Sequence, residues 1–479
     1  MSQFTHGTRV REQESKIKGI LAAKTPTVIV GTATINQGDI SCVNKPVLIQ
    51  SAKDAATYFG GTNNIKGFSI NEALYLANSV YNTYPIICIN ILDPENHKTA
   101  YEETDVVVVD GKAKLGKTGI ITGETLIIKN TDNLEIIPSE KYDINFDAEG
   151  KVVVKINDDS VKKINANYDF LDVSKVQETD VMGSINPKTL EAKGLELIKE
   201  IFPKFSMIPG CVIAPDFATA KIALALDAKA NVIDNKWGSF SIPEIPNTTK
   251  YGDVIDFKKK NNYIDEDQII VFGVPYIADE TFHASTVAAL IMQSVDAKND
   301  GVPFESPSNK NCKMHGIGYF ENEVFKKLNL SETEANLLNE NGISTILSRS
   351  NGTVFWGNRT SVFQPGGNME PKDMWITHKR MFKYIGNTIM LNNENEVDKP
   401  MTPSRCKSIE TNINTWLTAM TNEGKLLGGR AEFLPEENPQ NDLVMGKFKW
   451  HIYLGIITPG ETLEFILEYD GEYLNTLFK

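Results

Sequence analysis

The pattern of apolar residues changes twice along the chain, near residues 98 and 178, and this constrains the fold more than any other sequence feature. Residues 23–97 alternate short apolar runs such as Thr27–Gly31 with an amphipathic helical stretch. Residues 98–178 lack a helical period and consist of short β-rich runs separated by glycine and Asx turns. Helical periods then return. The chain therefore predicts an α/β domain that is interrupted by an all-β module.

Local signals predict helices on both sides of this interruption. Ser69-Ile-Asn-Glu72 and Ser331-Glu-Thr-Glu334 both match the capping box, in which a Ser and a Glu three residues later bind free N–H groups at a helix start. His283-Ala-Ser285 suggests a base and a nucleophile, but no G-x-S-x-G turn accompanies it, so we interpret it as the first turn of a helix. We expect helices over residues 189–201, 219–230 and 281–295.

The last quarter of the chain has a third pattern of apolar residues. Residues 373–391 and 403–422 have the spacing of two long amphipathic helices. The second helix carries an apolar face of Ile409, Ile413, Trp416, Leu417 and Met420. After the break at Gly428-Gly429, apolar residues alternate from Phe448 to Leu454 and again from Leu463 to Tyr469, which predicts strands.

These three hydrophobic patterns predict a multidomain fold of the α/β and α+β classes. A discontinuous α/β core carries an inserted all-β module and is followed by a C-terminal α+β domain. The first residues hold five basic side chains, His6 included, two acidic ones and few large apolar ones, so we expect an extended arm there. We place the boundaries at 1–22 (arm), 23–97 with 179–365 (core), 98–178 (β module), 366–460 (C-terminal domain) and 461–479 (strand and tail).

Composition excludes several classes of function. The 479 residues carry a net charge of −13 and no basic run, which disfavours nucleic acid and anionic lipid as partners. The five cysteines lie far apart and are odd in number, which indicates free and mostly buried thiols in a reducing compartment. No apolar run has the length of a membrane span and no secretory signal begins the sequence, so we expect a soluble, cytosolic protein without membrane insertion.

One motif imitates a nucleotide site. Gly111-Lys-Ala-Lys-Leu-Gly116-Lys117-Thr118 matches the P-loop pattern G-x-x-x-x-G-K-[ST]. A P-loop also needs a helix that begins at the lysine, because the helix N-terminus faces the phosphates. The following residues, Gly119 to Ile128, include two glycines and β-branched runs that disfavour a helix. We therefore expect a hairpin turn here, and we predict no catalytic, cofactor or metal site in this chain.

The order of several sequence blocks resembles the contractile tail sheath proteins of bacteriophages and phage-like particles. The chain departs from this family at Gly301-Val302, where a Gly–Trp pair is usual, and the β module is its least similar part. The blocks are His6-Gly-Thr-Arg-Val10, Thr27-Val-Ile-Val-Gly-Thr-Ala33, Ile208-Pro-Gly-Cys-Val-Ile-Ala-Pro-Asp216, Val271-Phe-Gly-Val-Pro275, Gly301-Val-Pro-Phe-Glu-Ser-Pro-Ser-Asn309, Leu338-Asn-Glu-Asn-Gly-Ile-Ser-Thr-Ile346, Val354-Phe-Trp-Gly-Asn-Arg-Thr360 and Trp375-Ile-Thr-His-Lys-Arg380.

The resemblance implies a structural polymer and not an enzyme. It implies homo-oligomeric rings stacked around an inner tail tube, contraction from a metastable extended state, and baseplate and tail terminator proteins as further partners. The particle would be a virion tail assembled in the bacterial cytoplasm, and no cofactor is implied. The termini would add strands to a sheet of an adjacent subunit. The expected interface residues are Thr8, Arg9 and Val10 in the arm and Leu463, Phe465, Leu467 and Tyr469 near the C-terminus.

Alternatives remain at this stage. The segment Leu463–Tyr469 fits equally well as a strand of its own subunit's sheet, after a hairpin return from residues 451–457. A P-loop NTPase built on Gly111–Thr118, and a host- or carbohydrate-binding protein that uses the β module, are the alternative functions. The sequence does not separate a virion sheath from that of a bacteriocin-like particle.

Overall fold

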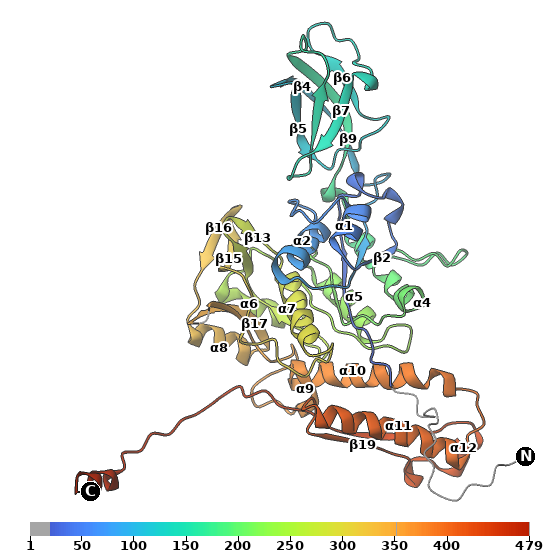
Figure 1. Ribbon diagram of the computed structural model, residues 1–479, viewed down its shortest axis with the longest axis vertical. Helices are drawn as coiled ribbons and strands as arrows, with labels where there is room; N and C mark the ends of the chain where they lie inside the picture. Colours follow the sequence, from blue (N-terminus) through green and yellow to red (C-terminus); the bar gives the residue numbers. More distant parts are fainter. Residues whose placement is uncertain (1–19, 351, 479) are drawn as a thin grey trace, which may run out of the picture.

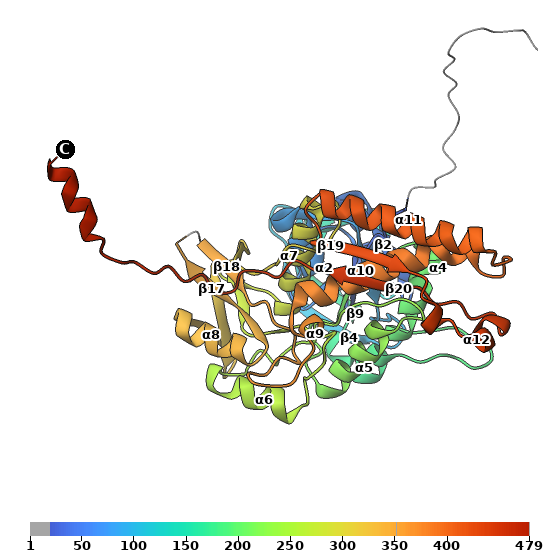
Figure 2. The same cartoon turned by 90° about the horizontal axis from the view of Figure 1, so that it is seen from below.

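The computed structural model describes residues 20–350 and 352–478, and it is elongated (Figure 1). A β-rich body lies at one end, an α/β body in the middle and a layer of long helices at the other end. The C-terminal segment leaves this layer as an extended chain (Figures 1 and 2). The fold is therefore a mixed α/β fold with several sheets.

Two four-stranded sheets form the centre of the α/β body. In the first, β1 runs parallel to β10 and β3, and β2 closes the edge antiparallel to β3. Its order is β10 (Cys211–Ile213), β1 (Thr27–Gly31), β3 (Ile86–Asn90) and β2 (Pro46–Ile49). The order of the second is β11 (Ile270–Val271), β17 (Ile343–Arg349), β18 (Gly352–Trp356) and β14 (Lys310–Asn311).

Ser241 joins these two sheets. It forms a parallel bridge to Val212 of β10 on one side and to Gln268, just before β11, on the other. The backbone bonds Ile242 N–H to Val212 C=O (3.2 Å) and Ile269 N–H to Ser241 C=O (3.0 Å) continue the ladder. The α/β body is thus spanned by one continuous sheet that narrows to a single residue in the middle.

Helices cover both faces of this sheet, because its strands are buried on both sides. Alternate residues of β1 enter different cores: Ile29 belongs to one cluster, and Val28 and Val30 belong to the other. The first cluster includes α2 (Ser69–Tyr75) and α7 (Ala284–Lys298), and the second includes α5 (Ala220–Asn231).

The remaining elements complete the α/β body and the helical layer. The α/β body also holds an antiparallel sheet of β13 (Glu280–Thr281), β12 (Val274–Ile277), β15 (Gly316–Glu321) and β16 (Val324–Leu328). Its other helices are α1 (Ala52–Phe59), α3 (Glu178–Met182), α4 (Ile201–Phe205), α6 (Val254–Lys260) and α8 (Glu332–Glu340). The helical layer consists of α9 (Pro371–Met374), α10 (Ile376–Asn393), α11 (Pro403–Asn422), β19 (Gly428–Glu432), α12 (Gln440–Val444) and β20 (His451–Gly455).

The β-rich body has its own hydrophobic core, in which Val152, Val154, Ile164 and Tyr168 are buried. Its entry and exit lie side by side, because Lys98 at the start of β4 pairs with Leu171 at the end of β9. One sheet has the order β4 (Lys98–Val107), β9 (Lys163–Leu171) and β6 (Ile127–Asn130). The other has the order β5 (Lys112–Thr118), β8 (Lys151–Ile156) and β7 (Tyr142–Phe146).

The P-loop-like segment Gly111–Thr118 lies mostly in strand β5 and does not form a phosphate-binding loop. The chain continues from it into a turn and then into β6, and no helix begins at Lys117. The Gly116 N–H donates to the Glu103 carboxylate at 3.0 Å. The Lys117 ammonium lies over the Tyr101 ring, 4.9 Å from its centroid. The predicted absence of a P-loop helix at this motif is confirmed. The expected hairpin turn is wrong for most of the motif, because Lys112–Thr118 form strand β5 and only Gly111 lies in a turn.

The two capping-box predictions have opposite outcomes. Ser331 and Glu334 form the reciprocal bonds of a capping box at the start of α8, as predicted. The Ser69 capping box is wrong, because Phe68 is the N-cap of α2 and makes no side-chain cap bond. The Ser69 hydroxyl instead accepts a hydrogen bond from the Thr32 N–H at 3.2 Å.

The predicted helices shift in several places. Residues 219–230 form α5 with Thr219 as its N-cap, and residues 403–422 form α11 as expected. The helix expected over 189–201 is wrong, because an isolated bridge between Ile185 and Ala192 precedes a 3₁₀ helix at Gly194–Glu200. The helix expected from residue 281 begins at Ala284, and the helix expected over 373–391 is interrupted at Trp375, which has extended backbone.

The expected free cysteines are confirmed: all five thiols are unpaired and buried. Within residues 20–350 and 352–478, no helix is long and apolar enough to cross a membrane. The same part of the chain contains no cluster of His, Cys, Asp or Glu suited to a metal ion.

Helix α10 is fixed to the α/β body by a row of ion pairs. Arg380 forms two bonds with Asp296 of α7, one of them 3.2 Å long, and both side chains are about nine-tenths buried. Lys383 binds Asp267 at 2.6 Å. The Asn387 amide donates to the Gly238 C=O and accepts from the Gly238 N–H. Breaking a buried charge pair leaves an unpaired charge, so these pairs tie α10 to the α/β body.

This arrangement predicts the cost of breaking the central pair. Asp296→Ala leaves a buried guanidinium without its partner, so we expect a loss of about 3–5 kcal/mol in the free energy of unfolding. Urea denaturation measures this loss. The matched control is Glu149→Ala, which breaks the exposed pairs of Glu149 with Lys114 and Lys151 and should cost less than about 1 kcal/mol. Equal losses in the two variants would contradict the assigned role of the pair.

Candidate functional site

The candidate site is the β19–β20 hairpin together with the two points at which the chain ends leave the body. The hairpin packs on α11: Ala431 of β19 joins Ile413 and Leu417 in one buried cluster. Ile452 and Leu454 of β20 pack against the same cluster. On the opposite face, the Arg430 guanidinium lies 3.9 Å from the Tyr453 ring centroid. The hairpin thus has one dry face and one solvent-facing face.

A side chain of α11 caps the outer edge of β19 at Ala431. The Asn414 amide donates to the Ala431 C=O at 2.9 Å and accepts from the Ala431 N–H at 2.7 Å. Both backbone groups of Ala431 therefore point away from β20. The Asn414 side chain supplies the bonds that a neighbouring strand would otherwise make.

The outer edge of β20, in contrast, has no such cap. Ala431 and Gly429 pair with Ile452 and Leu454 across the hairpin. Since facing residues in an antiparallel pair turn their N–H and C=O groups either toward or away from each other, Ile452 and Leu454 direct theirs outward. Within the described residues, no hydrogen bond is recorded at these outward groups. An open strand edge is a template for another strand.

The C-terminal segment is held at its root and free beyond it. Arg359 binds the Glu461 carboxylate with two bonds, of 3.1 and 2.5 Å. The guanidinium also stacks between Trp375 and Phe363, 3.5 and 4.2 Å from the two ring centroids. This combined ion pair and aromatic stack fixes the point and direction of departure of the segment.

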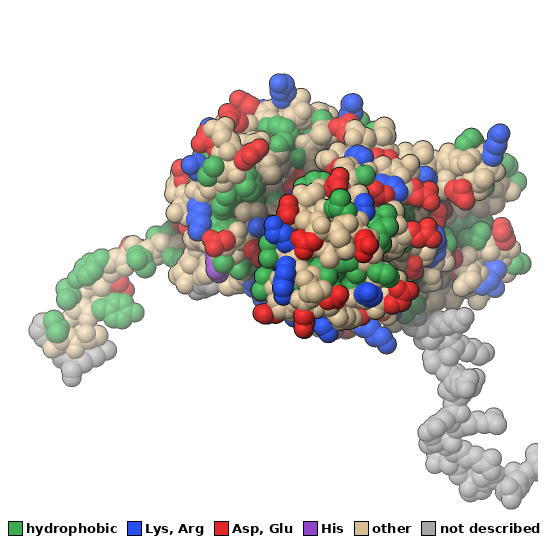
Figure 3. Space-filling view, turned by 90° about the horizontal axis from the view of Figure 1, so that it is seen from above, with side chains coloured by type: hydrophobic (Ala, Val, Ile, Leu, Met, Phe, Trp, Pro, Cys, Tyr) green, Lys and Arg blue, Asp and Glu red, His purple; other side chains and the backbone are tan. Residues whose placement is uncertain are grey.

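Beyond Glu461 the chain exposes apolar side chains on both sides. The predicted interface residues Leu463, Phe465, Leu467 and Tyr469 are all exposed, with Leu467 at 96%, and so is Ile466. Hydrophobic side chains cover this segment in the space-filling view (Figure 3). Residues 456–470 form neither helix nor strand, so the alternative of a strand in the subunit's own sheet is wrong.

The other chain end is anchored at the opposite end of α10. The Asn392 amide accepts from the Leu21 N–H and donates to the Leu21 C=O, both at 2.8 Å. The Ala23 N–H donates to the Thr388 hydroxyl at 3.3 Å. The predicted arm residues Thr8, Arg9 and Val10 lie outside the described part of the chain. Because α10 has 18 residues, about 27 Å separates its two ends, so the two chain ends leave the body at well-separated points.

His283 belongs to an ionic cluster that no local sequence pattern indicates. Its Nδ1 lies 2.9 Å from the Glu72 carboxylate, and its Nε2 lies 2.8 Å from Asp216. Burial alone would lower the pKa of His283, but the two carboxylates outweigh it and raise the pKa well above the usual range. The three residues are 67 and 211 positions apart, so no local spacing indicates them.

This cluster is not arranged for nucleophilic catalysis. The Ser285 hydroxyl donates to Glu244 and not to His283, and Ser285 is 1% exposed. A Ser nucleophile activated by His283 needs the imidazole within hydrogen-bond reach and an open approach for the substrate, and Ser285 has neither. The cluster instead ties α2, α7 and the loop after β10 together. The sequence-based interpretation of His283 as a helix-start residue is confirmed, since His283 is the N-cap of α7.

Comparison with known proteins gives relatives over nearly the whole chain. No protein-family model matches it. The chain is 26% identical over 500 residues to the tail sheath protein of Burkholderia phage BcepMu, with 99% of each chain covered. It is similar in structure to a chain of the PVC contractile injection system sheath in the contracted state, with a TM-score of 0.58, 13% identity and coverage of 98% and 99%. A chain of the anti-feeding prophage baseplate structure gives a TM-score of 0.57, 15% identity and coverage of 98% and 100%.

The Asn414 cap predicts a measurable contribution to stability. Asn414→Ala leaves the N–H and C=O groups of Ala431 without partners, so we expect a loss of about 1–3 kcal/mol in the free energy of unfolding. Urea denaturation followed by circular dichroism provides the measurement. Thr418→Ala, at an exposed position on the same helix, is the control and should change stability by less than about 0.5 kcal/mol. An unchanged stability of the Asn414 variant would show that this cap contributes nothing.

The His283 cluster predicts a pH-dependent stability. The folded-state pKa of His283 is raised, so its stabilising effect is complete below the unfolded value of about 6.5 and is lost as the pH rises through the folded value. We therefore expect the stability difference between the native protein and His283→Gln to shrink as the pH rises above about 6.5. Denaturant unfolding at several pH values measures this difference. A difference that grows with pH would contradict the charged state of His283.

Proposed function

The chain belongs to the tail sheath protein family of phages and phage-tail-like particles, and from that premise we propose how it acts as a subunit of a contractile sheath. It is a structural protein and not an enzyme. Its place is in a phage tail or a tail-like particle. The finer proposals below concern how its subunits connect, which further proteins it meets and how its domains share the work.

We propose that subunits connect by strand exchange at the β19–β20 hairpin. The observation that carries this proposal is the open outer edge of β20 beside two chain ends anchored at opposite ends of α10. An extended segment satisfies such an edge through backbone hydrogen bonds, and alternate side chains set its register. Leu463, Phe465, Leu467 and Tyr469 supply one face of a donor from the C-terminus, and the arm with Thr8, Arg9 and Val10 supplies the other donor.

In this proposal the subunits move as rigid bodies during contraction, and the exchanged strands act as the hinges that connect them. The ion pairs of α10 keep the hairpin fixed to the α/β body, while hydrogen-bonded strands link it to its neighbours. Stacked rings around an inner tail tube, with baseplate and terminator proteins at the ends, complete the proposed assembly. The stored energy lies in subunit packing, so the proposed mechanism uses no cofactor.

We also propose a division of labour between domains. The arm (1–22), the discontinuous core (23–97 and 179–365) and the C-terminal domain with its strand and tail (366–460 and 461–479) build the sheath wall. The β module (98–178) has its own core and a paired entry and exit, which supports a position on the outer surface. The proposed location of the whole assembly is a virion tail built in the bacterial cytoplasm.

The function predicts what the purified protein does. Negative-stain electron microscopy should show striated tubes for the native chain. Deleting residues 1–19 should abolish the tubes, because it removes a connecting strand, and should leave a cooperative melting transition because the deletion stops before the Leu21 anchor. Normal tubes from the shortened chain would show that the arm does not link the subunits.

The division of labour predicts the effect of removing the β module. Replacing residues 99–170 by a short Gly/Ser linker should leave both tube formation and the melting of the remaining chain intact, because Lys98 and Leu171 lie directly opposite each other and Leu171 stays in the core of the α/β body. Electron microscopy and calorimetry check these two outcomes. A folded deletion variant that forms no tubes would place the module in the sheath wall.

A further inference from the structure

An apolar groove lies where α10 and α11 meet the start of β20. It has a volume of about 760 Å³. The connection between the two helices forms one wall, and the residues just before β20 form the other. Among its lining side chains are Met390, Pro400, Met401, Ile409, Phe448 and Trp450.

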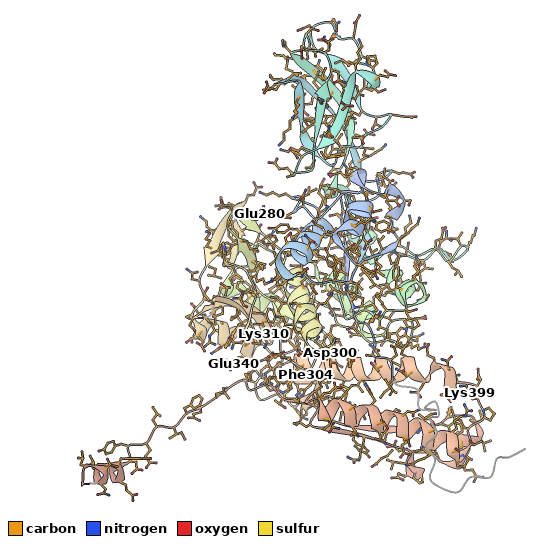
Figure 4. The ribbon with its side chains drawn as sticks, viewed as in Figure 1. Glu280, Asp300, Phe304, Lys310, Glu340 and Lys399 are labelled. Carbon is orange, nitrogen blue, oxygen red and sulfur yellow. The ribbon has the colours of Figure 1, made fainter. Side chains whose placement is uncertain are left out.

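The surroundings of this groove are unusually apolar for a protein surface. Val397 lines the groove and is 68% exposed, and Val444 and Met445, next to the lining residue Gly446, are 78% and 73% exposed. A contiguous apolar surface of this kind marks an interaction site. Lys399, which also lines the groove, lies at the end of the helical layer far from the departing C-terminal segment (Figure 4).

The C-terminal segment of the same chain ends in a complementary element. Residues Gly471–Phe478 form a 3₁₀ helix on which Tyr473, Leu474 and Leu477 are exposed, at 73%, 54% and 77%. In its own subunit this element points away from the groove (Figure 2). A helix with exposed apolar side chains needs a hydrophobic surface to cover it, and a second copy of the chain provides one.

The direction in which a donor strand pairs with the open edge of β20 determines where the terminal helix that follows it lies. Seven residues, Leu463–Tyr469, span about 23 Å as a strand, enough to pass the five residues of β20. If the donor runs antiparallel to β20, it passes from Gly455 toward His451. The chain that follows Tyr469 then reaches Trp450 and Phe448, which line the groove. A parallel donor would deliver its end to the opposite side of the hairpin.

Two acidic residues, Glu396 and Asp398, line the groove on the side of the helix connection, and Glu396 is paired with Lys399 and Arg405. The side next to β20 carries lysines and matches the charge of the terminal segment. Residues 461–478 contain five acidic side chains and no Lys or Arg. Lys447 and Lys449 flank Phe448 at the groove, and Lys447 is exposed and has no ion-pair partner within the described residues. Asp470 and Glu472, at the start of the terminal helix, would lie near these two lysines in the antiparallel arrangement.

We propose that this groove binds the terminal helix, Gly471–Phe478, of a second copy of the chain whose preceding strand runs antiparallel to β20. The proposal rests on the proposed function, because it extends strand exchange by a terminal anchor. The anchor adds buried apolar side chains to a link otherwise made of backbone hydrogen bonds.

Disulfide trapping tests the arrangement. One variant carries Leu474→Cys, and a second carries Val397→Cys at the groove. The matched control carries Leu427→Cys, which is equally exposed but lies at the Gly455 end of the hairpin. All native cysteines are buried, so mild oxidation reports on the introduced pair. Each pair of variants is mixed, assembled, oxidised and separated on a non-reducing gel.

We expect a dimer band from Leu474→Cys with Val397→Cys, and none from Leu474→Cys with Leu427→Cys. A dimer only with Leu427→Cys means a parallel donor and overturns the proposal. Tubes without either dimer overturn the groove as the binding site but leave the sheath function standing. Absence of tubes from the native chain under the same conditions overturns the proposed function and this inference together.

A truncation gives an independent measurement. Removing residues 471–479 leaves the donor strand intact, so tubes should still form. The protein concentration needed for assembly should rise about tenfold or more, because buried leucine contacts are lost. An unchanged assembly concentration contradicts the anchor.

Discussion

The outward N–H and C=O groups of Ile452 and Leu454 are the constraint on which the rest of this molecule depends. Backbone groups left unpaired along a strand are a template for another strand, and a two-stranded hairpin has little stability of its own. Helix α11 supports one face of the hairpin, and Asn414 caps Ala431 of β19. The β20 edge is then the one at which we propose that another chain adds. The C-terminal segment also lacks a partner strand, and its apolar side chains are exposed on both sides.

The ion pairs around α10 give this edge a fixed orientation. Arg380 with Asp296 and Lys383 with Asp267 join the helical layer to the α/β body at buried positions. Both chain ends are anchored on or beside the same helix, through Asn392 at one end and through Arg359, which stacks on Trp375, at the other. The roots of the two donor segments and the acceptor edge are therefore attached to one body.

The sequence predicts this fold well where local signals agree with the tertiary structure. Helix α11 and the capping box at Ser331 follow directly from spacing, because nothing else competes for their side chains. The Ser69 box fails because Glu72 is bound by His283, 211 residues away. Ser241 completes the central sheet with a single residue, which is too short for any periodicity. The Asn414 cap likewise depends on a hairpin that follows it, and no spacing rule anticipates it.

The alternation in Leu463–Tyr469 shows a different limit. It correctly indicates a segment suited to a strand, but alternation says nothing about which sheet will receive it. In the structure the segment does not join its own subunit's sheet, since the side chains on both of its sides are exposed. The alternating pattern predicts that one side is buried, and this burial requires a second chain.

The amide of Asn414 has a consequence for the growth of the assembly. A hairpin with two open edges would act as a bifunctional monomer, and strands could stack on it without limit, as they do in fibrils. With Ala431 of β19 capped, new strands add at the β20 edge, so the sheet grows in one direction only. The side of the hairpin on which a link forms is then set by its covalent structure and not by concentration. One side chain on α11 thereby gives the growing sheet a direction.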